Sequence, residues 1–326
     1  MNLSLICIYD HAQLIAQDGF VECPVCHHHY PVVDGVVCML EIPDDFYEGH
    51  YGNQTHFVPR SEKPWYVWPL WLINSGYVWN VRKWLPHGAT IVELGCAGGV
   101  RYFGHRYNMI GFDLSFAGLK SIDFYQYRVQ GDAATCISLP DQSVDAVVSS
   151  YFWEHIPPDV KPGILKECQR ILKPGGKLIF LYDVETNNPL IRRYKAQNLL
   201  YYTKLFIEGD GHFGYQWPAE NNALFQSAGF QIREHRGMEK TFLQSPSAYG
   251  KLAQFSEGNN LKSLGEIGSS RWFYLWTLLM RLVDTVVGPL LPENWSRIDL
   301  LIAEKPLSTG VIASAIESIN TLSSKP

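Results

Sequence analysis

The feature that most constrains the fold is the stretch ATIVELGCAGGV, which runs from Ala89 to Val100. Its first part, Thr90 to Leu94, is β-branched and apolar with one acidic residue, and this predicts a short buried strand. The small residues that follow predict a tight turn that opens a helix, where backbone N–H groups can approach a ligand closely. Twenty residues after Glu93, a second apolar segment ends in Asp113, where a carboxylate can accept hydrogen bonds from ribose hydroxyls. This spacing is typical of a nucleoside-binding βαβ unit.

The sequence of the turn favours one class of nucleoside. A dinucleotide site needs Gly-x-Gly-x-x-Gly and room for a pyrophosphate, whereas this turn reads Gly95-Cys96-Ala97-Gly98-Gly99 and has Glu93 two residues before it. A carboxylate at the strand tip repels a pyrophosphate but suits an ammonium group or a ribose. The segment therefore favours S-adenosylmethionine over a nicotinamide dinucleotide, although a glycine-rich turn alone is weak evidence.

Four further landmarks follow in order: Gly131-Asp132-Ala133, LPDQSVDAVVSS (139–150), YFWEHI (151–156) and ECQRILKPGGKLIF (167–180). Together with the turn, over about residues 75–185, they resemble the class I S-adenosylmethionine-dependent methyltransferases. The departures are Glu93, where aspartate is commoner, and Ala97 in place of a glycine. The resemblance implies an α/β fold with a doubly wound, seven-stranded Rossmann-like sheet.

The resemblance also implies a binding site for S-adenosylmethionine at the carboxyl ends of the strands. Glu93 is expected near the methionine amino group, Asp113 at the ribose and Asp132 at the adenine edge. An alternative role for Asp132 is to cap a turn. The predicted cofactor-binding residues are Glu93, Gly95, Cys96, Ala97, Gly99, Asp113, Leu114, Asp132, Ala133, Ser149 and Ser150.

Two histidines are candidates for the catalytic group. Methyl transfer is an in-line displacement, for which the protein mainly positions donor and acceptor, but a hydroxyl acceptor must also lose its proton. His155 follows the predicted fourth strand, at the sheet edge where ligands bind in doubly wound folds. His212 lies in the insertion that follows the fifth strand. For His155 the alternative is a structural hydrogen bond to backbone, and Glu154 is expected to orient a loop.

Residues 1–42 form a small unit with cysteines at metal-binding spacing. Cys23 and Cys26 form a C-x2-C pair, and Cys7 precedes them. The segment resembles the zinc-ribbon unit found before some methyltransferase domains, in which two such pairs hold zinc. The first pair is degenerate here, so Cys7, Cys23 and Cys26 would need Asp10 or His11 as a fourth ligand. The alternative is a ribbon without metal that folds on an apolar core.

The rest of the chain divides by composition. Residues 43–75 are rich in proline and aromatic residues and are expected to be a linker or a lid, and the methyltransferase-like domain is expected over 76–305. An insertion at 185–217 and a helical region at 245–292 are expected to cover the substrate. The apolar stretch 271–291 predicts a helix packed on the domain or on a second subunit, with peripheral membrane contact as an alternative. Residues 306–326 are expected to be a tail.

Charge and cysteine content limit the function classes. Residues 1–59 contain eight acidic residues and no lysine or arginine, whereas the whole chain carries a net charge of −5. Seven cysteines argue against a disulfide framework, and with no secretory signal they predict a cytoplasmic protein. We therefore expect methyl transfer to an oxygen or nitrogen of a small-molecule, saccharide or lipid-linked acceptor. The alternatives are a ribosomal RNA methyltransferase, which the acidic segment disfavours, and a non-catalytic partner that binds S-adenosylmethionine.

Overall fold

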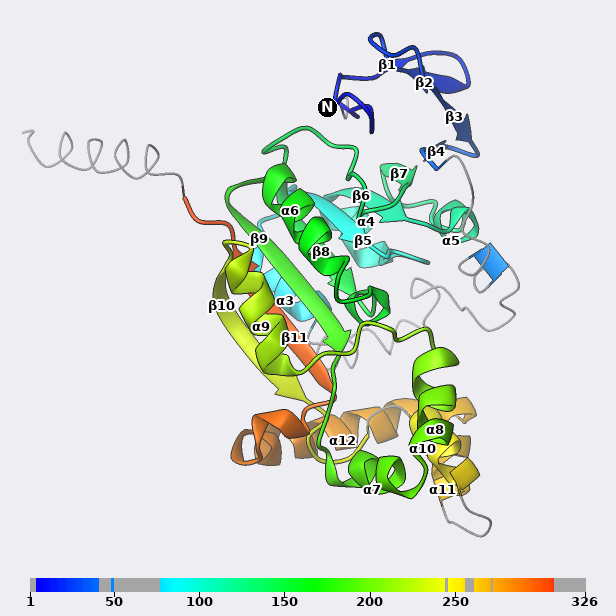
Figure 1. The fold of residues 1–326 in the computed structure, drawn as a ribbon, viewed down its shortest axis with the longest axis vertical. Coiled ribbons are helices and arrows are strands. Elements are labelled where there is room, and N and C mark those ends of the chain that lie inside the picture. Colours follow the sequence, from blue (N-terminus) through cyan, green and yellow to red (C-terminus); the bar gives the residue numbers. More distant parts are fainter. Residues whose placement is uncertain are drawn as a thin grey trace, which may run out of the picture.

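The computed structural model describes residues 4–40, 48–49, 77–243, 246–255, 261–270 and 272–307. The predicted linker or lid at 43–75, apart from residues 48–49, and the tail beyond residue 307 lie outside these ranges. The described strands form one sheet in the order β1-β2-β3-β4-β7-β6-β5-β8-β9-β11-β10 (Figure 1). They are β1 (Ile15–Ala16), β2 (Phe20–Glu22), β3 (His29–Val33), β4 (Val36–Cys38), β5 (Thr90–Leu94), β6 (Asn108–Asp113), β7 (Tyr127–Gln130), β8 (Val144–Ser150), β9 (Leu172–Asp183), β10 (Gln231–Met238) and β11 (Ile298–Glu304).

Seven neighbouring strands of the sheet, in the order β7-β6-β5-β8-β9-β11-β10, have the predicted methyltransferase topology. Strands β7, β6, β5, β8 and β9 are parallel, and β11 and then β10 pair antiparallel beside β9. The chain starts in the middle of this sheet at β5, moves outward to β7, and then crosses to β8 and β9. The turn after β5 therefore lies at the topological switch point, where open α/β sheets bind ligands. The predicted α/β doubly wound fold is confirmed.

The N-terminal unit is joined to this sheet by hydrogen bonds. Strand β4 pairs parallel with β7, with Val37 beside Val129 and Cys38 beside Gln130. Ile6 also donates its N–H to the carbonyl of Ser138, at 3.1 Å. We expected a separate small unit in front of a seven-stranded sheet, but here the unit extends the sheet at the edge formed by β7.

Helices cover both faces of the sheet and one end of it. Their bounds are α3 (Tyr77–Trp84), α4 (Arg101–Arg106), α5 (Phe116–Lys120), α6 (Lys161–Ile171), α7 (Pro189–Gln197), α8 (Leu199–Tyr202), α9 (Pro218–Ser227), α10 (Pro246–Leu252), α11 (Leu261–Glu266) and α12 (Phe273–Val287). Two apolar clusters pack against the sheet, one under α6 and α9 and one under α3 and α4. Helices α7, α8, α10, α11 and α12 gather beyond the carboxyl end of β9 (Figure 1); they lie in the two regions that we expect to cover the substrate, and are called the cover below.

The cover has its own apolar core. Tyr194, Tyr202 and Phe206 from the insertion pack there with Tyr249 of α10, while Trp276 of α12 packs against them. The aromatic residues of the insertion therefore stabilise the cover. The other face of α12 exposes Leu275, Leu279, Leu282 and Val286. Among the described helices, none is long and apolar enough to cross a membrane.

Candidate functional site

The turn after β5 has the backbone shape that its glycines predict. Gly95 has a φ of +61°, and a Cβ atom placed on it would lie 2.6 Å from the ring of Phe152. Gly98 and Gly99 also have positive φ, whereas Ala97 is not among the residues with positive φ in the described chain. Alanine is therefore tolerated at the position where this chain departs from the family pattern.

Asp113 lies at the end of β6 and holds the turn in place. Its carboxylate accepts from the N–H of Ala97 at 3.0 Å and from the N–H of Ser115 at 2.9 Å. Burial raises the pKa of Asp113 to about 6, because desolvation disfavours the charged carboxylate more than these two donors favour it. Each carboxylate oxygen has a second lone pair, so the same group can also accept from the hydroxyls of a ribose.

Glu93 is 2% exposed and lies between two tyrosines. Its Oε1 accepts from the hydroxyl of Tyr77 at 2.7 Å, and its Oε2 accepts from the hydroxyl of Tyr125. Tyr125 also accepts from the N–H of Val100, at 2.8 Å, at the start of α4. The carboxylate is thus fixed beneath the turn by one tyrosine donor on each oxygen, and neither tyrosine was identified from the sequence.

The remaining predicted cofactor residues line the same edge. Asp132 caps the turn after β7, since its carboxylate accepts from Ala134 and Thr135; the alternative role considered for it is therefore present in the structure. Ser149 donates to the carbonyl of Leu94 at 3.0 Å, which ties the end of β8 to the end of β5. Five further residues show backbone or packing roles: Cys96, Ala133 and Ser150 are buried, Gly99 shapes the turn, and the Leu114 carbonyl accepts from Gln130.

One residue of the expected lid segment reaches this edge. Glu48 accepts from the backbone N–H groups of Phe116 and Ala117, the latter at 3.2 Å, at the first turn of α5. A carboxylate is favourable there because the N–H groups at a helix start point outward. This contact brings the 43–75 segment to the side of Asp113 at one point.

The two candidate catalytic histidines meet on the other side of the turn, beyond the end of β8. The ring centroids of His155 and His212 lie 4.8 Å apart in an edge-to-face arrangement. His155 Nδ1 lies 3.0 Å from the carbonyl of Gly211, and His212 Nδ1 lies 2.8 Å from the hydroxyl of Tyr215. Since a carbonyl only accepts, His155 carries its proton on Nδ1 when neutral. Its Nε2 then carries the lone pair.

His212 has several partners. Its Nδ1 lies beside the hydroxyl of Tyr215, which donates to Asp183 Oδ2 at 3.4 Å, and the backbone carbonyl of Phe206 also interacts with this imidazole. Burial lowers the pKa of His212 to about 4, so this imidazole is neutral at pH 7. The structure thus brings together two histidines that are 57 residues apart in the sequence.

Buried charged groups surround the histidine pair. Glu154 is 1% exposed, and in the described chain neither of its carboxylate oxygens has a hydrogen-bond partner. Burial, with the carboxyl of Asp183 adding to it, raises the pKa of Glu154 well above its ordinary value. Lys161 donates to the Gly214 carbonyl at 2.6 Å, and burial lowers its pKa to about 7. Glu154, which we expect to orient a loop, is therefore a buried carboxyl beside the two histidines.

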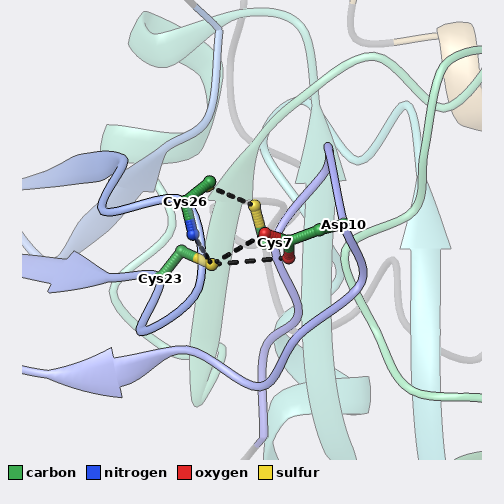
Figure 2. A group of neighbouring side chains, drawn as sticks. All are labelled: Cys7, Asp10, Cys23 and Cys26. Carbon is green, nitrogen blue, oxygen red and sulfur yellow. Dashed lines mark hydrogen bonds between the residues drawn. The ribbon is translucent and has the colours of Figure 1, made fainter.

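The four predicted metal ligands of the N-terminal unit also come together. Cys7, Asp10, Cys23 and Cys26 each offer one atom within 4.8 Å of the others, and Figure 2 shows the side chains pointing toward one another. The sulfur atoms of Cys7 and Cys26 lie 3.6 Å apart, and Cys23 Sγ lies 3.3 Å from Asp10 Oδ2. His11, the alternative fourth ligand, is not part of this cluster.

The two halves of the cluster have matching backbone geometry. The N–H of His11 donates to the carbonyl of Cys7 at 3.1 Å, and the N–H of His27 donates to the carbonyl of Cys23 at 3.0 Å. Both histidines have a φ near +60°. The sulfur of each of these cysteines accepts a backbone N–H from the residue two positions later. Asp10 thus takes the place, in the first half, that Cys26 has in the second.

Several functional residues were missed from the sequence. Asp183 is the last residue of β9, just as Asp113 is the last residue of β6. Because ligands bind at the carboxyl ends of such strands, the sequence was sufficient to identify Asp183. Arg297 lies beside it, with 3.5 Å between Nη1 and Asp183 Oδ2, and no local pattern indicates this residue. Tyr77, Tyr125 and Tyr215 likewise depend on packing between distant segments.

The chain is similar to several known proteins. The family described as a methyltransferase domain matches residues 92–180. A ubiquinone biosynthesis O-methyltransferase of Xanthomonas axonopodis pv. citri (strain 306) is 29% identical over 165 residues, which cover 47% of this chain and 67% of that protein. A 2-phytyl-1,4-naphtoquinone methyltransferase of Synechococcus elongatus is 29% identical over 132 residues, covering 36% and 54%. Among solved structures, a putative methyltransferase of Bacillus halodurans C-125 is 18% identical, with a TM-score of 0.44 over 74% of this chain and 98% of that one.

The chain spans about two thirds or less of the length of the curated relatives that it matches. The match of residues 92–180 includes the end of β5, the glycine turn, Asp113 and the histidine that follows β8. The sheet order and this matched region together make the protein a class I S-adenosylmethionine-dependent methyltransferase.

Proposed function

We propose that the protein transfers the methyl group of S-adenosylmethionine to an oxygen atom of a small-molecule acceptor. The acceptor would bind between the glycine turn and the helical cover, in front of His155 and His212. The observation that carries this proposal is the meeting of His155 and His212 at the carboxyl edge of the sheet, because an imidazole there can take the proton of an acceptor. Such a base suits an acceptor hydroxyl, which must lose its proton before or during methyl transfer.

Two further observations support a small and partly apolar acceptor. The two relatives described above are named for methylation in the biosynthesis of ubiquinone and for a naphthoquinone. The outer face of α12 exposes leucine and valine side chains beside the cover, which supports an acceptor that is lipid-linked and reached from a membrane surface. Transfer to nitrogen is the second possibility, and it would not need the histidine lone pairs for proton removal before attack.

We also propose that Cys7, Asp10, Cys23 and Cys26 hold a structural zinc ion. Three thiolates and one carboxylate suit tetrahedral zinc, and the two matching backbone halves of the cluster support such a site. The ion would fix the N-terminal unit, which in turn extends the sheet through β4. Its role would be in folding, since the cluster belongs to the N-terminal unit, which joins the sheet at β7, whereas His155 follows β8.

The experiment has two stages. S-adenosylhomocysteine is first titrated calorimetrically into the protein and into Asp113→Ala, and we expect binding that the variant loses. Transfer from labelled S-adenosylmethionine is then measured with paired acceptors that differ only in a phenolic hydroxyl or an amine. Transfer to the hydroxyl, reduced at least a hundredfold in the double variant His155→Gln/His212→Gln, supports the proposal. Preference for the amine, or full activity of the double variant, contradicts transfer to oxygen.

A further inference from the structure

A pocket of about 320 Å³ lies between the end of β10 and the C-terminal half of α12. Its walls include Arg236 of β10 and two charged residues of α12, Arg281 and Asp284. None of the residues proposed to act on the methyl donor or the acceptor lines it. A volume of this size is within the range of small-molecule binding sites, so the pocket is a candidate for a second site.

Arg281 lines this pocket without a counterion. Its Nε and Nη1 atoms are buried, and neither has a hydrogen-bond partner among the described residues. Burial lowers the pKa of its guanidinium, and the charge of Arg236 in the same pocket also lowers it. Neither residue takes part in an ion pair of the described chain, where the paired arginines are Arg101, Arg170, Arg233 and Arg297. A bound anion would supply the countercharge that a buried cation requires.

The two carboxylates that interact electrostatically with Arg281 serve other donors. Asp284 accepts from three consecutive backbone N–H groups, those of residues 239–241, at 2.8–3.1 Å. Glu239 accepts from Nε of Arg297 at 2.7 Å. An anion that enters the pocket therefore does not compete with either carboxylate for the donors that hold it.

The other cations of the pocket are paired. Lys240 donates to Glu293, and His235 Nε2 lies 2.9 Å from Asp299 Oδ2. These pairs hold the wall of the pocket together and use the charges that they contain. The two arginines thus remain as the uncompensated positive charges of the described lining.

An exposed apolar row runs along α12 toward the same pocket. Its side chains follow one another at helical spacing: Leu275, Leu279, Leu282 and Val286. Leu290, in the turn after the helix, is 84% exposed. Thr285 and Pro289 line the pocket and directly precede Val286 and Leu290 in the sequence. A ligand in the pocket would therefore lie next to an exposed apolar surface, which is a feature of interaction sites.

We propose that this pocket binds the phosphate of an anionic lipid headgroup, while the apolar row of α12 contacts the hydrocarbon of the same membrane surface. Two guanidinium groups suit a phosphate, whose oxygens accept charge-assisted hydrogen bonds. A helix binds to a membrane surface when its apolar face is buried at the acyl boundary and cationic groups meet anionic headgroups. A phospholipid accounts for both features at once, because it carries an anion and apolar chains in one molecule. The inference goes beyond methyl transfer and does not depend on it.

Vesicle flotation tests the proposal with the full-length protein. Vesicles of phosphatidylcholine alone are compared with vesicles that also contain phosphatidylglycerol, and we expect the protein to prefer the latter. Arg281→Gln and Arg236→Gln should each lower that affinity about fivefold or more. Arg236 is exposed, so its variant tests the pocket even if Arg281→Gln does not fold. Leu282→Ser/Val286→Ser should lower the affinity about tenfold or more, because it removes apolar surface that the membrane would bury.

Arg233→Gln is the matched control. Arg233 also belongs to β10, but it is paired with Glu304 at 3.1 Å and does not line the pocket. This variant removes the same charge and should keep the wild-type affinity for vesicles. Equal affinity of the wild type for both kinds of vesicle would overturn the proposal. So would equal losses in Arg233→Gln and the two pocket variants, or unchanged affinity in both pocket variants.

Two further measurements test other occupants. Calorimetry with inorganic phosphate tests a soluble ligand: binding that Arg281→Gln loses, in a protein that does not bind vesicles, would overturn the lipid proposal. Light scattering tests a second copy of the chain: a dimer that Leu282→Ser/Val286→Ser dissociates, again without vesicle binding, would overturn it as well. All variants should still bind S-adenosylhomocysteine, which shows that they fold. A failure of the lipid proposal would therefore leave the proposed methyl transfer unaffected.

Discussion

Replacing Gly95 by alanine tests whether contact with Phe152 dictates the shape of the cofactor turn. The φ of +61° at Gly95 costs an alanine about 1–2 kcal/mol. The new Cβ would lie 2.6–2.8 Å from three atoms of the Phe152 side chain, and such overpacking costs about 1–3 kcal/mol more. Alanine also reduces the conformational entropy of the unfolded chain, which offsets about 0.4–1 kcal/mol of this loss. We therefore expect Gly95→Ala to lower the free energy of unfolding by about 2–4 kcal/mol.

Gly88→Ala is the control, because Gly88 has a φ of +77° and open space where its Cβ would be. It carries the same conformational cost without the clash, so its loss should be about 1 kcal/mol. Urea unfolding of both variants gives the difference, and calorimetry with S-adenosylhomocysteine gives the effect on the site. Only Gly95→Ala should weaken binding, since only there must the turn move away from Phe152. Equal losses of stability in the two variants would refute the reasoning.

Three further outcomes are expected. The ionised carboxylate of Asp113 is the proposed acceptor for ribose, and burial raises its pKa to about 6. Calorimetry should therefore show that the affinity for S-adenosylhomocysteine falls about tenfold from pH 7 to pH 5. Asp113→Asn should bind weakly at both pH values, and a wild-type affinity that does not change with pH would contradict this role. Tyr77→Phe removes a donor from the buried Glu93 and should cost about 1–3 kcal/mol in urea unfolding, so an unchanged midpoint would argue against the contact. A zinc chelator should lower the unfolding temperature of the wild type but not that of Cys23→Ser. The reason is that bound zinc would stabilise the folded protein by about 3 kcal/mol when free zinc is a hundredfold above Kd. Equal shifts in the two proteins would contradict a zinc site.

The cofactor half of the site could be predicted from the sequence because its signal is local. The strand Thr90–Leu94, the small residues after it and Asp113 lie within 24 residues, and each has a type that its backbone position requires. A positive φ demands glycine at position 95, while position 97 accepts alanine, and both requirements can be read along the chain. The structure therefore adds the partners of these residues but does not change their positions.

What could not be predicted depends on contacts between distant segments. Tyr77 and Tyr125 meet at Glu93 only because α3 and the segment before β7 pack on the same face of β5. The pairing of β4 with β7 joins positions 92 residues apart, and no alternation of apolar residues indicates which edge a short strand will choose. The spacing of the cysteines likewise could not decide whether Asp10 or His11 takes the place of the missing cysteine.

The meeting of His155 and His212 has a definite structural cause in Gly214. The N–H of Gly214 donates to the carbonyl of Glu154 at 2.7 Å, and a Cβ atom there would lie 2.1 Å from the carbonyl of Ile156. Only glycine allows the insertion to approach the end of β8 so closely. Lys161 strengthens the same junction, because its ammonium group donates to the Gly214 carbonyl from α6. The insertion is therefore joined to the sheet at the place where the histidines meet, so a shift of the cover at this junction would change the distance between the two rings. The rate of the proposed methyl transfer should therefore depend on where the cover lies relative to the sheet.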